Sequence, residues 1–136
     1  MHLEIMLKNF KVQEKSLEVL YIDDLKMNQY ILEELFRDMN VNLDTCDSAI
    51  ESYKLCEKKE YDFILIDIQM PEIDGITAYK HIRANSTKNW KTPIAAFTAS
   101  QELPTSSKYL EIGFCSYLNK PISKKKLRKI INEVGF

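Results

Sequence analysis

Five short runs of apolar residues are spaced along the chain. They cover residues 17–22, 43–46, 63–66, 94–97 and 116–118. Each has the length and the branched or aromatic content of a β-strand, and a continuous apolar run is typical of a strand that is buried on both faces. The pattern therefore predicts five strands in the core of one sheet.

Segments of helical period separate and follow these strands. The apolar stripes are Tyr30, Ile31, Leu35 and Met39 in the first segment, Ile50, Tyr53 and Leu55 in the second, Ile76, Tyr79 and Ile82 in the third, and Leu127, Ile130, Ile131 and Val134 in the last. A further short helix is predicted within residues 105–113, where a glycine ends it. Strands that alternate with helices predict parallel pairing through right-handed crossovers. We expect an α/β fold of five strands and five helices, in one domain over residues 16–136.

The first fifteen residues lie outside this alternation. Leu3, Met6, Leu7 and Phe10 repeat at i, i+3, i+4 and i+7, which predicts a short amphipathic helix in an extension over residues 1–15. That helix would pack on the domain or on a second copy of the chain, in a homodimer. The alternative interpretation is a tail or the remnant of a linker.

Composition narrows the setting. The chain has 136 residues, 19 Lys and Arg against 20 Asp and Glu, and a net charge of -1, which gives no support for binding nucleic acid. The basic run at 124–129 fits the solvated face of the last helix, with a protein partner as the second interpretation.

No apolar run reaches the length of about 18 residues that spans a membrane, and the start lacks a secretory leader, so a cytoplasmic protein is expected. The three cysteines, Cys46, Cys56 and Cys115, fit buried reduced thiols.

Polar residues stand where several of the predicted strands end. These residues are Asp23 and Asp24 after the first strand, Asp67 at the end of the third, Thr98 at the end of the fourth and Lys120 after the fifth. Each alone has a structural explanation: an aspartate can cap the helix that starts near Lys26, a threonine suits a strand and a lysine suits a surface. Because the carboxyl ends of parallel strands share one edge, their coincidence predicts a site there.

The chemistry of such a cluster is restricted. Three converging carboxylates repel one another unless a cation lies among them, and Mg²⁺ prefers oxygen ligands of this kind. An aspartate can also act as a nucleophile and form an aspartyl-phosphate. Phosphoryl transfer requires mainly positioning and charge neutralisation, which Mg²⁺, the Thr98 hydroxyl and the Lys120 ammonium would supply.

Four segments carry a resemblance to a known family. The segments "VLYIDDLKMNQ", "ILIDIQMPEIDG", "AAFTAS" and "YLNKPIS" resemble, in order and separation, the signature segments of response regulator receiver domains in two-component signalling. The resemblance implies a flavodoxin-like, doubly wound sheet of order 2-1-3-4-5. It implies that Asp67 is the phosphoacceptor, that Asp23, Asp24 and the main-chain carbonyl of Gln69 hold Mg²⁺ with it, and that Thr98 and Lys120 contact the phosphoryl oxygens. It also makes the Lys120–Pro121 bond a candidate for the cis isomer.

The resemblance further implies a switch and a set of partners. On phosphorylation the Thr98 hydroxyl would move inward and Tyr117 would rotate into the vacated space, which alters the surface of the fourth helix, fifth strand and fifth helix. The segments are most similar to receivers of hybrid sensor kinases and to stand-alone receivers. The implied phosphoryl donor is a histidine kinase or a histidine phosphotransfer protein, and the sequence does not name the downstream protein.

Two other functions remain open at this point. One is a receiver-like interaction module that phosphorylation does not control. The other is a Mg²⁺-dependent phosphohydrolase of the haloacid-dehalogenase type, but Asp67-Ile68-Gln69 lacks the second carboxylate of the DxD motif in that family. We therefore expect no enzyme activity beyond self-phosphorylation and autodephosphorylation.

After the third strand, Pro71 and Gly75 are predicted to turn the chain away from Asp67.

Overall fold

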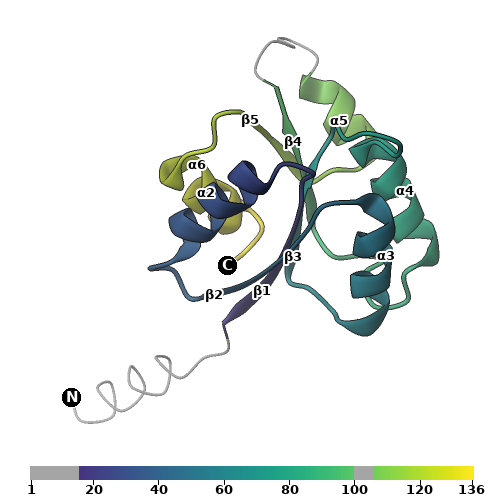
Figure 1. The fold of residues 1–136 in the computed structure, drawn as a ribbon, viewed down its shortest axis with the longest axis horizontal. Coiled ribbons are helices and arrows are strands. Elements are labelled where there is room, and N and C mark those ends of the chain that lie inside the picture. The colour runs from purple at the N-terminus through teal and green to yellow at the C-terminus, as the bar shows by residue number, and fades with distance from the viewer. Residues whose placement is uncertain (1–15, 100–105) are drawn as a thin grey trace.

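A five-stranded parallel sheet forms the centre of the computed structural model, which describes residues 16–99 and 106–136 (Figure 1). The strands are β1 (Leu17–Ile22), β2 (Val41–Cys46), β3 (Phe63–Asp67), β4 (Ile94–Thr98) and β5 (Ser116–Asn119). Their order in the sheet is β2-β1-β3-β4-β5, and every neighbouring pair is parallel. The predicted doubly wound sheet and its strand order are confirmed.

Five helices within the described residues cover both faces of the sheet. They are α2 (Lys26–Phe36), α3 (Ala49–Lys58), α4 (Gly75–Asn85), α5 (Ser106–Ile112) and α6 (Lys124–Glu133). Figure 1 shows α2 and α6 on one side of the sheet and α3, α4 and α5 on the other. None of these helices has the length and apolar character that crossing a membrane requires. The amphipathic helix predicted within residues 1–15 lies outside the described residues.

The core consists of two apolar layers, one on each face of the sheet. Leu20 and Ile22 of β1 face the layer under α3, α4 and α5, whereas Val19 and Tyr21 face the layer under α2 and α6. All five residues of β3 are buried, as are all five of β4. This burial explains the unbroken apolar runs, because a central parallel strand has no solvent-facing side.

The predicted apolar stripe on α2 is only partly correct: Leu35 packs against the core, as does Met39 just after the helix, but the other two residues do not. Tyr30 and Ile31 are 62% and 42% exposed, and the helix buries Gln29, Leu32 and Phe36 instead. The side-chain amide of Gln29 donates to the carbonyl oxygens of two residues that follow β1 and end β2, at 2.8 and 3.2 Å. A polar residue therefore occupies the inner face, which a pattern of apolar residues does not reveal. The helix also ends at Phe36, before the predicted Met39.

One smaller prediction is wrong and another is correct only in part. Ile50 is 52% exposed, because α3 packs through the small residues Ala49, Ser52 and Cys56. Among the cysteines, Cys46 and Cys56 are buried as predicted, whereas Cys115 is exposed where the chain enters β5. The sheet core thus sets which strand residues are buried, while helix faces depend on individual packing contacts.

Candidate functional site

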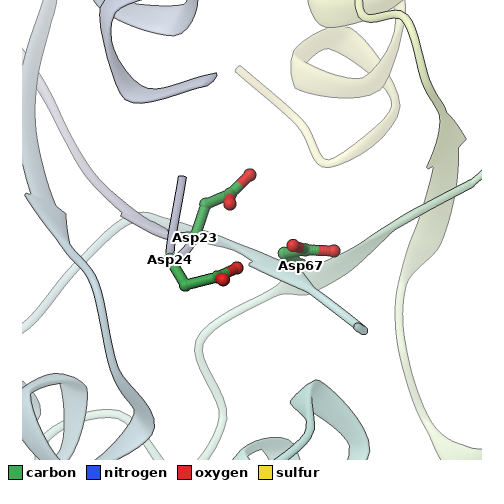
Figure 2. A group of neighbouring side chains, drawn as sticks. All are labelled: Asp23, Asp24 and Asp67. Atoms are coloured by element: carbon green, nitrogen blue, oxygen red, sulfur yellow. The ribbon is translucent and has the colours of Figure 1, made fainter. Parts of the chain in front are cut away.

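Three carboxylates converge at the carboxyl ends of β1 and β3 (Figure 2). Asp23 and Asp24 follow β1, and Asp67 is the last residue of β3, in the adjacent strand. Oxygen atoms of the three side chains lie within 4.8 Å of one another. Asp23 and Asp67 are 0% and 1% exposed, and Asp24 is half-buried. The parallel register between β1 and β3, in which Ile22 is paired with Ile66, places these side chains together.

In the part of the chain that the structure describes, three neutral donors bond to the Asp23 carboxylate. Its Oδ1 accepts from the Leu25 backbone N–H at 2.9 Å, and its Oδ2 accepts from the Tyr21 hydroxyl at 2.5 Å and from Asn28 Nδ2 at 2.9 Å. Burial and the charge of Asp23 raise the pKa of Tyr21, so its hydroxyl remains protonated and donates. Leu25 is the N-cap of α2 and makes no side-chain cap, so neither aspartate caps this helix.

The positive charge beside Asp67 is too small to offset the burial and the negative charge that disfavour its ionised form. Its Oδ1 accepts from the Gln69 backbone N–H at 3.2 Å and lies 3.3 Å from Lys120 Nζ. Burial, followed by the charge of Asp23, raises the pKa of Asp67 from 3.8 to about 6, although Lys120 and the Gln69 N–H act in the opposite direction. One ammonium group therefore does not offset burial and the neighbouring carboxylate.

This donor set fits a divalent cation. Three carboxylates within reach of one ion, two of them buried, offer the hard oxygen ligands that Mg²⁺ takes in proteins. Burial and the Asp23 carboxylate both raise the pKa of Asp67, and a cation bound among the carboxylates would lower it. Gln69 lies in the loop after β3, two residues after Asp67. Its main-chain carbonyl therefore stays a predicted fourth ligand.

Thr98 and Lys120 reach the same edge from β4 and β5. Thr98 is the last residue of β4 and is 3% exposed, and its carbonyl accepts from the Lys120 N–H at 2.9 Å. The Lys120 ammonium lies 5.1 Å from the centroid of the Phe97 ring, which helps to direct it toward Asp67. The Lys120–Pro121 bond is cis, as predicted.

The Thr98 hydroxyl has a partner that the sequence did not indicate. Its Oγ1 lies 3.4 Å from the hydroxyl of Tyr109, a buried residue of α5. The Tyr109 ring is 6.3 Å from that of Tyr117, which is half-buried in β5. The predicted switch pair, Thr98 and Tyr117, is therefore bridged by a third side chain. Much of the predicted switch loop, residues 100–105, lies outside the described residues.

The loop after β3 differs in detail from the prediction. Gly75 does not close a turn but begins α4, and its N–H donates to the Ile68 carbonyl at 2.9 Å. A Cβ at Gly75 would lie 2.4 Å from the carbonyl oxygen of Asp67, so glycine is needed for close approach. The turn itself contains Glu72, with a φ of 68°. Asp74 then caps α4 by accepting from the Thr77 N–H at 2.8 Å.

Sequence reasoning missed Tyr21, Asn28 and Tyr109. Residues two apart on a strand share a face, so the position of Tyr21 two residues before Asp23 was a usable signal. Asn28 is the third residue of α2, within reach of the preceding loop, and its position is a weaker signal. The contact of Tyr109 depends on how α5 packs on the sheet, and no local pattern encodes it.

The chain is similar in sequence to a known protein family and to proteins that contain a domain of that family. Residues 19–132 match the family model described as "Response regulator receiver domain". The chain is 35% identical over 123 residues to hybrid signal transduction histidine kinase G of Dictyostelium discoideum, covering 89% of this chain and 4% of that protein. It thus spans a small part of the length of this relative.

Solved structures that share the fold include the following two receiver domains. The receiver domain of sensor histidine kinase PA1611 from Pseudomonas aeruginosa PAO1, with a magnesium ion coordinated in its active site cleft, is 29% identical with a TM-score of 0.78; the match covers 89% of this chain and 99% of that one. The second is the receiver domain of Saccharomyces cerevisiae Ssk1, which was solved in complex with the histidine phosphotransfer signaling protein Ypd1. It is 28% identical to this chain with a TM-score of 0.76, and the match covers 89% of this chain and 90% of that one.

Proposed function

Because the chain belongs to the response regulator receiver family of two-component systems, we propose that it accepts a phosphoryl group on Asp67 from a phosphohistidine donor. The observation that carries this proposal is the cluster itself: a buried carboxylate at the end of β3, faced by two further carboxylates and by the Lys120 ammonium. The pKa of Asp67, at about 6, leaves its carboxyl group mostly ionised at pH 7.5 and able to attack phosphorus.

In the proposed transfer, an Asp67 carboxylate oxygen forms a bond to phosphorus as the bond between phosphorus and the donor imidazole nitrogen breaks. The imidazole leaves with the electron pair of that bond and becomes neutral histidine after proton uptake. The Lys120 ammonium lies beside Asp67 and would pair with the transferred group, and the Thr98 hydroxyl would donate to it. Asp67 acts as the nucleophile and the other two side chains stabilise charge.

Mg²⁺ fits the same cluster as the resident cation. We assign Asp23, Asp24, Asp67 and the Gln69 carbonyl as the groups that would hold it. When bound, the ion would neutralise charge between the carboxylates and the phosphoryl oxygens. The magnesium-containing receiver of PA1611, a protein of the same fold, supports this assignment.

The signal would leave the site through Thr98. A phosphoryl group on Asp67 adds negative charge and acceptor oxygens, which compete with Tyr109 for the Thr98 hydroxyl. Movement of Thr98 would free the aromatic pair of Tyr109 and Tyr117 to rearrange, which would alter the surface formed by α5, β5 and α6. The contact at 3.4 Å is long for a hydrogen bond between hydroxyls, so it opposes this movement only weakly.

Acetyl phosphate with Mg²⁺ tests the chemistry. Intact mass spectrometry should show the gain of one phosphoryl group, which disappears in Asp67→Asn and when Mg²⁺ is removed by EDTA. Asp47→Asn, the same change at an exposed carboxylate, should leave the adduct in place. Absence of an adduct on the unaltered chain would refute the proposal and leave an interaction module that phosphorylation does not control.

A histidine phosphotransfer protein is the proposed physiological donor. The similarity to the Ssk1 receiver, which was solved in complex with Ypd1, supports this class of partner. Radiolabelled phosphotransfer proteins can be mixed with the chain and the label followed over seconds to minutes. Transfer to the unaltered chain but not to Asp67→Asn is expected, and retention of all label on each donor tested would contradict this class of partner.

A further inference from the structure

We propose that Tyr21 is a positioning residue that helps to leave Asp23 a single lone pair for a cation and thereby favours Mg²⁺ over the larger Ca²⁺. This inference rests on the proposed metal site. It concerns a side chain of the sheet core that does not itself belong to the set of proposed ligands.

Tyr21 has little freedom in the core. Its side chain is 1% exposed, and its ring meets that of Phe97 edge-on, with centroids 6.0 Å apart and planes at 65°. Both residues belong to the apolar layer under α2 and α6. A ring packed in this way directs its hydroxyl along one line, and the acceptor on that line is Asp23 Oδ2, at 2.5 Å.

The hydrogen bonds of Asp23 then limit what the carboxylate can offer to a cation. An ionised carboxylate has about four lone-pair sites, two on each oxygen. On Oδ2 the Tyr21 hydroxyl and the Asn28 amide take both sites, and on Oδ1 the Leu25 N–H takes one. With respect to donors from residues 16–99 and 106–136, one site on Oδ1 remains. Asp23 can therefore act only as a monodentate ligand, or accept from one metal-bound water.

Such a restriction discriminates between the two ions. Mg²⁺ takes six oxygen ligands in a strict octahedron and keeps several waters, so monodentate carboxylates suit it. Ca²⁺ takes six to eight ligands at longer distances, tolerates irregular geometry and gains from bidentate carboxylates. Removal of the Tyr21 hydroxyl would free a site on Oδ2 and release the carboxylate to rotate, which raises both the number and the flexibility of the ligands. That change benefits Ca²⁺ more than Mg²⁺.

The test is the ratio of the Kd for Ca²⁺ to the Kd for Mg²⁺, measured by isothermal titration calorimetry on the full chain. Tyr21→Phe keeps the ring and removes only the hydroxyl, and we expect this ratio to fall by about fivefold, the effect of one ordinary hydrogen bond. Asn28→Ala frees the other site on Oδ2 and should lower the ratio in the same direction. This second variant carries the test if Tyr21→Phe does not fold.

Tyr61→Phe is a matched control for the loss of a buried tyrosine hydroxyl. Tyr61 is 2% exposed and its hydroxyl donates to Asp44 Oδ2 at 2.8 Å, outside the acidic cluster. It should lower stability without changing the ratio of the two dissociation constants. A ratio for Tyr21→Phe within twofold of the unaltered chain would overturn the inference alone. Failure of the unaltered chain to bind Mg²⁺ would overturn the proposed metal site as well.

Discussion

Replacement of Asp67 by asparagine should make the metal-free protein more stable at neutral pH, although it removes the proposed nucleophile. The folded protein holds this carboxylate buried beside Asp23, and its pKa is raised from 3.8 to about 6. A raised pKa means that ionisation of the group is less favourable in the folded state than in the unfolded state. Asparagine has nearly the same shape and no charge, so the substitution removes this cost.

The magnitude follows from the two pKa values. A difference of about two pKa units at 1.36 kcal/mol each corresponds to about 3 kcal/mol of destabilisation above pH 6, where the carboxyl group is ionised in both states. The sign at lower pH follows from proton binding. Between pH 3.8 and 6 the folded state binds the proton more strongly than the unfolded state, so the cost shrinks as the pH falls. At pH 4.5 about 1 kcal/mol should remain.

Urea unfolding in EDTA at pH 7.5 and pH 4.5 measures this difference. Asp67→Asn should raise the free energy of unfolding by about 3 kcal/mol at the higher pH and by about 1 kcal/mol at the lower one. Asp47→Asn, at an exposed carboxylate, should change it by less than about 0.5 kcal/mol at either pH. A gain for Asp67→Asn that is equal at both pH values, or a loss at pH 7.5, would refute the electrostatic argument. Addition of Mg²⁺ should stabilise the unaltered chain and so reduce the difference in free energy of unfolding between it and Asp67→Asn.

Three further substitutions test the structure around the site by the same urea assay. Glu72→Gly relieves a φ of 68° and should raise the free energy of unfolding by about 1 kcal/mol; a loss would contradict strain at this turn. Gly75→Ala should lower it by about 2 kcal/mol, because the new Cβ would lie 2.4 Å from the Asp67 carbonyl oxygen, and no change would show that the loop relaxes freely. Asn89→Ala removes a fully buried side chain that donates to two carbonyl oxygens and accepts from two donors, and should cost about 3 kcal/mol. The same change at the exposed Asn85 should cost less than about 0.5 kcal/mol.

The sheet was predictable because burial on both faces removes ambiguity. A central strand such as β3 shows an unbroken apolar run, and its end is marked by the first ionisable residue, Asp67. Parallel connection then brings the ends of β1, β3, β4 and β5 to one edge without any knowledge of side-chain packing. The helices lack this constraint. The amphipathic pattern of α2 predicts correctly that Leu35 packs on the core and wrongly that Tyr30 and Ile31 do. Gln29 takes an inward position there through hydrogen bonds to main-chain carbonyls.

The two hydroxyl contacts of the site also differ in how far the sequence predicts them. The Thr98–Tyr109 contact joins a strand to a helix that lies beyond the undescribed residues 100–105, so its formation depends on how α5 packs. The Tyr21–Asp23 contact joins residues two apart, and alternation along β1 places both on one side of the sheet. Sequence thus encodes that these two side chains are neighbours, whereas the packing of the Tyr21 ring against Phe97 is a tertiary contact that the sequence pattern does not encode. A chain that differs from this one only by an apolar residue at position 21 would have the same predicted metal site and a less restrained Asp23.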